Sequence, residues 1–136
     1  MTALQKICVA YFGVLLAAAS INYLPMPGMV DENGLAFGIF ALDVFDDALH
    51  LVSALWALSS ALISHRASRF FLGVFGALYL GDGVFGFFTG YGYLDLGIFT
   101  NASEGMSFTF GRIAANVPHL ALGAFALFAF LRLDKR

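Results

Sequence analysis

The sequence has 136 residues, of which 60% are hydrophobic and only 12% are charged. A soluble domain of this size carries about one-quarter charged residues, because most of its residues touch water. The composition therefore excludes an ordinary soluble domain. The few Lys and Arg residues form no basic stripe, which excludes a nucleic-acid-binding domain. A single cysteine, Cys8, excludes an internal disulfide.

Four apolar segments follow one another along the chain, at residues 5–24, 44–64, 69–90 and 112–132. Each has about 20 residues, enough for a helix to cross a hydrocarbon core of about 30 Å. We therefore predict an all-α membrane protein, a single domain of residues 1–136 with four transmembrane helices. The first segment resembles a signal peptide, but we expect it to be retained because it has a counterpart later in the chain.

The basic residues predict the orientation of these helices. They lie before the first segment, between the second and third, and after the fourth: Lys6, His65, Arg66, Arg69, Arg132, Lys135 and Arg136. Only Arg112 falls on the opposite side, where most of the acidic residues lie. The positive-inside rule makes the basic side cytoplasmic, so we expect both termini in the cytoplasm.

The second and fourth segments match at an offset of 69 residues. Asp47-Ala-Leu-His50-Leu lies opposite Asn116-Val-Pro-His119-Leu. The first and third segments match at an offset of 70, with Gly and Val at 13–14 opposite Gly and Val at 83–84. We predict a duplicated helical hairpin with halves at about residues 1–66 and 67–136. Both copies run in the same direction, so they would be parallel repeats related by a pseudo-two-fold axis along the membrane normal.

The predicted repeat brings His50 and His119 to equivalent positions on two helices. Counting about 1.5 Å per residue from the helix ends places both of them, with Asp82, in the outer half of the membrane. Ionisable groups at such a depth are costly, so they normally point inward and pair. We therefore treat these residues as candidates for a functional site.

Three kinds of ligand would suit this group. Haem would be held between the imidazoles of His50 and His119, with Asp47 and Asn116 orienting the rings, and with Arg112 on the face of Asn116. A chlorophyll-type pigment would need only one histidine. A divalent metal would draw its ligands from both histidines and nearby carboxylates, namely His50, His119, Asp46, Asp47 and Asp82.

Two uses of the same residues need no ligand. His50 would hydrogen-bond Asp82 or Asp46, and His119 would pair with Asn116 or a carboxylate across the bundle, which would hold the helices together. The same polar face would alternatively carry protons or a solute. The sequence contains no nucleophile elbow, phosphate loop or Cys-pair zinc motif, which favours a protein that is not an enzyme. With so little chain outside the membrane, we expect an accessory or scaffold subunit that contacts a membrane-protein partner or a second copy.

The polar motifs also carry a resemblance. Asp47-x-x-His50-Leu and Asn116-x-x-His119-Leu, with Gly123 after the second, resemble a family of small bacterial four-span membrane proteins catalogued as a domain of unknown function. The resemblance extends from about residue 40 onward. It implies a four-helix architecture and the bacterial inner membrane, and it implies no activity. Asp47 stands where the family more often has Asn, which adds a charge beside His50.

Overall fold

The computed structural model describes residues 1–24 and 26–133, and the described residues are helical, with turns and two isolated β-bridges but no strand. Its elements, in chain order, are α1 (Ala3–Ser20), η1 (Ile21–Tyr23), α2 (Val44–Ile63), α3 (His65–Thr89), α4 (Gly97–Thr100), η2 (Ala102–Glu104) and α5 (Phe110–Arg132). The four long helices agree with the four predicted segments to within a few residues. Lys135 and Arg136, two of the basic residues used to predict the orientation, lie outside the described residues.

Each long helix begins at a residue whose side chain caps it. Thr2 and Asp43 form capping boxes with Gln5 and Asp46 at the starts of α1 and α2. These side chains accept hydrogen bonds from the backbone N–H groups that a helix start leaves without partners. Ser64 ends α2 and also caps α3, so a single extended residue joins these two helices.

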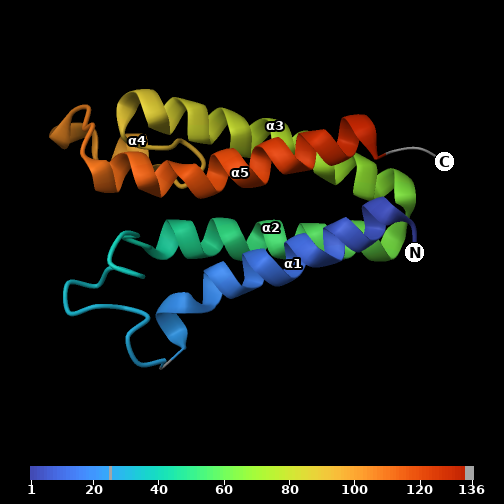
Figure 1. The fold of residues 1–136 in the computed structure, drawn as a ribbon, viewed down its shortest axis with the longest axis horizontal. Helices are drawn as coiled ribbons and strands as arrows, with labels where there is room; N and C mark the ends of the chain where they lie inside the picture. The colour runs from blue at the N-terminus through green and yellow to red at the C-terminus, as the bar shows by residue number, and fades with distance from the viewer. Residues whose placement is uncertain (25, 134–136) are drawn as a thin grey trace.

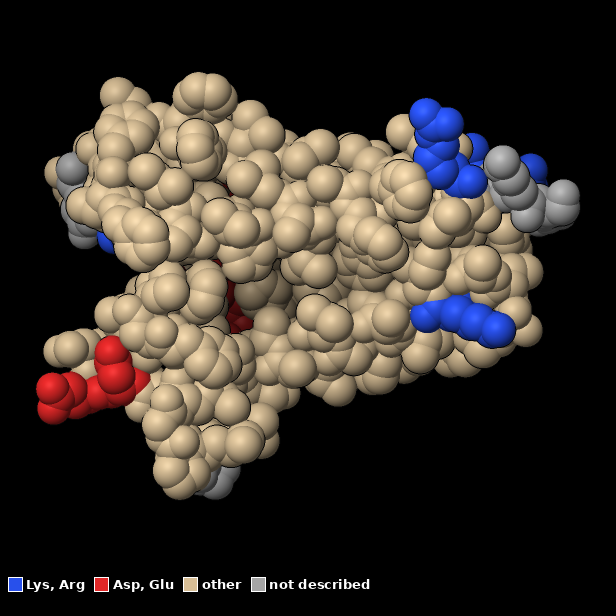
Figure 2. Space-filling model, viewed as in Figure 1, with Lys and Arg blue, Asp and Glu red and all other residues tan. Residues whose placement is uncertain are grey.

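The four long helices form two antiparallel pairs (Figure 1). α1 packs along α2, and α3 packs along α5, while the contact between the pairs runs mainly through α3. The described ends of the chain and the Ser64 link lie at one end of the bundle, and the long loops lie at the other. We call the first the basic end, since Lys6, Arg66, Arg69 and Arg132 belong to it, and the second the loop end. Figure 2 shows Lys and Arg gathered mainly at the basic end.

The core between the helices combines large side chains with small ones. α1 contributes Leu4, Cys8, Tyr11 and Leu15, and α3 contributes Phe71, Leu72, Phe75 and Tyr79. The other two helices contribute alanines, at 54, 57 and 61 on α2 and at 126 and 129 on α5. Small residues let helix backbones approach closely, which is the main source of helix association in lipid.

Glycines bring α3 and α5 closest together. A Cβ added at Gly123 would lie 2.2 Å from the backbone nitrogen of Leu80, and one added at Gly76 would lie 2.8 Å from that of Leu127. Neither backbone atom can move aside as a flexible side chain would. The α3–α5 pair therefore requires glycine at these two positions.

Three helical stretches are long and apolar enough to cross a membrane, namely Ala3–Tyr23, His65–Thr89 and Phe110–Arg132. They indicate a membrane protein. α2 is not one of them, although its 20 residues would reach about 30 Å. Asp46, Asp47 and His50 reduce its hydropathy, but all three side chains are buried inside the bundle.

The pattern of burial supports the predicted repeat for α2 and α5 but not for α1 and α3. At the offset of 69, buried residues of α2 correspond to buried residues of α5: Asp47 to Asn116, Ala54 to Gly123, Ala57 to Ala126, and Ser60 to Ala129. At the offset of 70, the buried residues of α1 fall opposite residues of α3 that are not buried: Val74, Leu78, Gly81 and Phe85. The duplicated hairpin therefore stays a prediction.

Candidate functional site

His119 of α5 forms a hydrogen-bonded pair with Asp82 of α3. Nδ1 of His119 lies within hydrogen-bond distance of Oδ2 of Asp82, and the aspartate side chain is fully buried. An ionised carboxylate only accepts, so Nδ1 carries the proton that it donates, and Nε2 keeps its lone pair. A histidine oriented in this way by a carboxylate is the usual arrangement of an imidazole that ligates through its other nitrogen.

The second oxygen of Asp82 fixes the loop that follows α3. The backbone N–H groups of Tyr93 and Leu94 each donate to Oδ1 at 2.7 Å. The chain therefore turns back into the bundle after Gly90, which ends α3 at φ 87°, and reaches the level of Asp82 (Figure 1). Gly92 is necessary here, because a Cβ at this position would lie 2.6 Å from Oδ1. Asp82 thus holds both the loop and the imidazole.

Tyr93 ties the same loop to α3 from outside the helix. Its hydroxyl donates to the backbone carbonyl of Leu78 at 2.9 Å. Burial, and then the negative charge of Asp82, raise the pKa of Tyr93 above its ordinary value. The phenol therefore stays protonated and continues to donate.

His50 faces His119 across the gap between the two helix pairs. The ring centroids are 5.8 Å apart and the ring planes are nearly perpendicular, at 82°. The His119 ring also lies 4.9 Å from that of Tyr79, whose hydroxyl shares a 2.9 Å hydrogen bond with Ser53 of α2. The two imidazoles therefore lie close together, one from each helix pair, as predicted from the sequence.

His50 and His119 differ in how their ring nitrogens are satisfied. Among the described residues, Nδ1 of His50 is buried without a hydrogen-bond partner, and so is Oδ1 of the neighbouring Asp47. A buried polar group without a partner costs about 1–3 kcal/mol, so native proteins seldom keep one without a reason. A ligand that bonded this nitrogen, beside the second imidazole, would remove that cost.

A cavity of about 480 Å³ contains both rings. One wall is apolar and comes from α1 and the loop before α2, while the other carries Asp46, His50, Asp82, Asp95 and His119. Figure 2 shows a hollow between the two helix pairs with acidic atoms deep inside it. The volume lies within the range of about 300–1,000 Å³ that small-molecule sites occupy.

The residues predicted to orient the histidines do not contact them by hydrogen bonds. The Asn116 amide donates to the backbone carbonyl of Arg112 at 2.8 Å, and Asp47 accepts from Asn22 at 3.4 Å. The guanidinium of Arg112 lies over the ring of Tyr91, 4.3 Å from its centroid. Asp82, which we predicted as a metal ligand, occupies the orienting position for His119 instead.

The carboxylates predicted as metal ligands are spread around the cavity. Asp46 accepts from the backbone of Asp43 at 3.0 Å in the cap of α2, away from the Asp82–His119 pair. Within residues 1–24 and 26–133, no three His, Cys, Asp or Glu side chains are arranged to hold a metal ion. The arrangement provides two imidazoles that face one another. Two protein ligands are enough for a metal ion whose other coordination positions are already filled by a cofactor.

Sequence reasoning missed three parts of this site. Tyr79 is a helical neighbour of Asp82 at a three-residue spacing, and its pattern is that of a core aromatic residue. Asp95 and the turn at Gly92 enter the cavity only because the loop after α3 folds back. The local sequence carries no signal for that turn beyond its glycines.

No protein-family model, curated protein or solved structure matches this chain. The resemblance to a family of four-span proteins therefore stays a prediction. Any functional conclusion rests on the geometry of the site.

Proposed function

We propose that all four long helices cross the membrane, with the basic end in the cytoplasm of a bacterium. α2 has the length of a span, and its charged residues point into the bundle, where lipid does not reach them. The gathering of Lys and Arg at one end supports the orientation through the positive-inside rule. The matched burial in α2 and α5 supports a duplicated origin of the two helix pairs.

Within this framework, the protein binds a ligand inside the membrane through His50 and His119. The observation that carries this proposal is the unpaired, buried Nδ1 of His50 in a ring that faces His119, itself oriented by Asp82. Both rings line one cavity of suitable volume. A bound ligand would give these polar groups partners that the described residues do not supply.

Haem is the ligand class that this donor set supports best. The porphyrin supplies four of the six ligands of the iron, so the protein needs to provide only two imidazoles. A bare divalent metal would need at least a third protein ligand, which the described residues do not bring into place. The apolar wall suits the face of a large ring system. His50 and His119 would hold the group, with Asp82 fixing the orientation of His119.

An absorption spectrum with elemental analysis tests this function on protein purified gently from membranes. We expect a Soret band and about one iron per chain, both lost in the His50→Ala/His119→Ala double variant. His65→Ala is the matched control, because His65 is the first residue of α3, lies outside the lining of the histidine cavity and bonds Thr2 at 3.0 Å. A well-folded, colourless protein that also fails to shift the spectrum of added haem would contradict the proposal.

The accessory role predicted from the sequence is compatible with this binding function. The outer surface exposes large apolar side chains, including Phe70, Phe88 and Leu131, as contact with lipid or with a protein partner requires. Transport is the third possibility, and it would need a polar route past the apolar core at Phe71, Phe75 and Leu15. Proton flux that Asp82→Asn abolishes would support it.

A further inference from the structure

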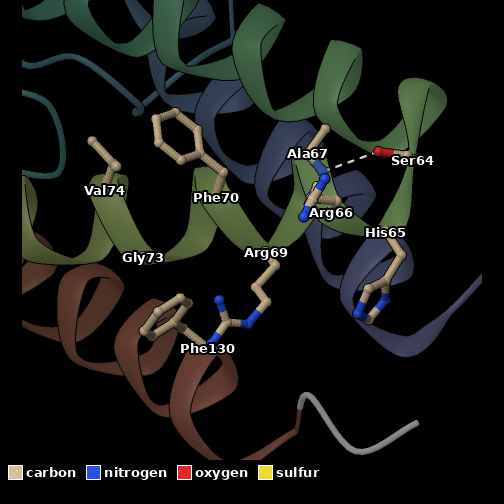
Figure 3. A pocket seen from close by; sticks show the side chains of 9 residues that line it. All are labelled: Ser64, His65, Arg66, Ala67, Arg69, Phe70, Gly73, Val74 and Phe130. Carbon is tan, nitrogen blue, oxygen red and sulfur yellow. Dashed lines mark hydrogen bonds between the residues drawn. The ribbon is translucent and has the colours of Figure 1, made fainter.

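A groove of about 1070 Å³ lies at the basic end of the bundle, away from the histidine cavity. One stripe of α3 and one residue of α5 provide its principal lining: Arg66, Arg69, Phe70, Gly73, Val74 and Phe130 (Figure 3). The residues from α3 are spaced by three and four positions, so they share one helical face. That face points away from the core, which α3 meets through Phe71, Leu72 and Phe75.

The groove changes from cationic to apolar along its length. Arg66 and Arg69 lie in the first two turns of α3, nearest the helix end, and both side chains are exposed. Gly73 and Val74 lie about one turn further into the bundle, Gly73 beside the ring of Phe130 and Val74 on the side of Phe70. A membrane-embedded groove of this kind matches a molecule with an anionic head at the interface and a hydrocarbon tail below it.

The side chains around the groove hold one cation in place. The guanidinium of Arg69 lies over the Phe130 ring, 4.3 Å from its centroid. Gly73 makes room for that ring, since a Cβ added there would lie 3.0 Å from its Cδ2 atom. The two helices together therefore position the charge beside the apolar floor of the groove.

The second cation is Arg66. Its side chain forms no hydrogen bond or ion pair with a described residue, and no described lining residue is acidic. The start of α3 adds little attraction for an anion, because the end of α2 lies directly beside it at Ser64 and carries the opposite partial charge. The two guanidinium groups are thus the main source of positive potential.

We propose that this groove binds an anionic phospholipid, with its phosphate on Arg66 and Arg69 and one acyl chain along Phe70, Gly73 and Val74. The anionic charge of the lipid complements the groove, and the apolar floor suits a chain rather than a soluble anion. Arginine suits phosphate because its planar fork donates two parallel hydrogen bonds. This inference does not depend on what the histidine cavity binds.

The fluorescence of the only tryptophan can report on lipid bound in this groove, because that residue lies beside one of the lining side chains. Trp56 of α2 lies against Phe70, with ring centroids 6.3 Å apart. We would reconstitute the full chain in phosphatidylcholine vesicles containing graded fractions of dibrominated phosphatidylglycerol and measure the quenching of Trp56 fluorescence. The reciprocal vesicles carry bromine on phosphatidylcholine and none on phosphatidylglycerol. The ratio of the two quenching curves gives the preference for the anionic lipid.

We expect clear preference for phosphatidylglycerol, reduced about fivefold by Arg66→Gln and again by Arg69→Gln. Arg69→Lys keeps the positive charge but changes the packing on Phe130, and it should retain most of the preference. This variant therefore separates the effect of the charge from the effect of the packing. Lys6→Gln is the matched control, because it removes a positive charge from the same end of the bundle on α1, outside the groove.

Three results would overturn the proposal. Equal quenching by the two brominated lipids would show that the groove does not select charge. An equal loss in Lys6→Gln and Arg66→Gln would reduce the effect to general attraction of the basic end to an anionic surface. Full displacement of phosphatidylglycerol from the groove by inorganic phosphate, at constant ionic strength, would identify a soluble anion as the occupant.

Discussion

Each helix pair places one histidine in the cavity, but the two pairs support their histidines differently. In the α3–α5 pair, Asp82 bonds His119 and also receives two backbone N–H groups. In the α1–α2 pair, His50 has a buried nitrogen to which no described residue bonds. At the predicted offset of 70, the residue of α1 that corresponds to Asp82 is Phe12. In the α3–α5 pair, both oxygens of Asp82 and Nδ1 of His119 therefore have partners, whereas Nδ1 of His50 in the α1–α2 pair lacks one among the described residues.

This difference indicates separate roles for the two imidazoles. A buried network with every group satisfied makes a structure rigid, whereas a partly satisfied one is destabilising unless something else completes it. We interpret the Asp82–His119 pair as the fixed wall of the cavity and His50 as the side that a ligand completes. Substitutions that act on one pair and spare the other test this interpretation.

The largest effect should come from Asp82→Ala. The substitution leaves Nδ1 of His119 and the N–H groups of Tyr93 and Leu94 buried without an acceptor. A buried donor left without an acceptor costs about 1–3 kcal/mol, and this substitution leaves three of them. Unfolding by SDS titration, followed by Trp56 fluorescence, should show a loss of about 4 kcal/mol. Loss of less than 1 kcal/mol would mean that the loop is held in place by other contacts.

Gly123→Ala should have a smaller effect than Asp82→Ala, because it acts only on the packing of the same pair. The new Cβ would lie 2.2 Å from the backbone nitrogen of Leu80, so α3 and α5 must separate. Overpacking typically costs about 1–3 kcal/mol, and a clash with backbone belongs at the upper end of that range.

Gly13→Ala is the matched control on α1. A Cβ there meets nothing within 4 Å, and the residue lies in the helix interior. Alanine should therefore stabilise the protein by about 0.5–1 kcal/mol through its lower conformational entropy in the unfolded chain. The same SDS titration measures both variants. Similar losses in the two would show that close α3–α5 contact is not what glycine provides at position 123.

The sequence predicted the helices well because their apolar length is a local property. The four segments, and the burial of His50, Asp82 and Asn116, follow from the cost of exposing polar groups to lipid. The juxtaposition of His50 and His119 followed from matching α2 to α5 at a fixed offset. These predictions needed no knowledge of how the chain turns between helices.

The parts that could not be predicted depend on the loops. The sequence left two partners open for His119, Asn116 or a carboxylate across the bundle, and in the structure the partner is the carboxylate of Asp82 on α3. That choice follows from the fixed contact of α3 with α5, which the glycines determine at atomic distances. The return of residues 90–96 into the bundle, which brings Asp95 to the cavity, depends on bonds to Asp82 that no local pattern encodes.

The smallest effect should come from His50→Leu, measured on protein without added ligand. Leucine has a similar volume and removes a buried nitrogen that has no partner, so stability should change by no more than about 1 kcal/mol, in either direction. The same substitution at His119 should cost about 3–5 kcal/mol, since it leaves the charge of Asp82 buried and unpaired. The contrast between these two variants measures the asymmetry directly. An equally large loss at both positions would mean that His50 is already satisfied in the membrane, and the argument that it awaits a ligand would then fail.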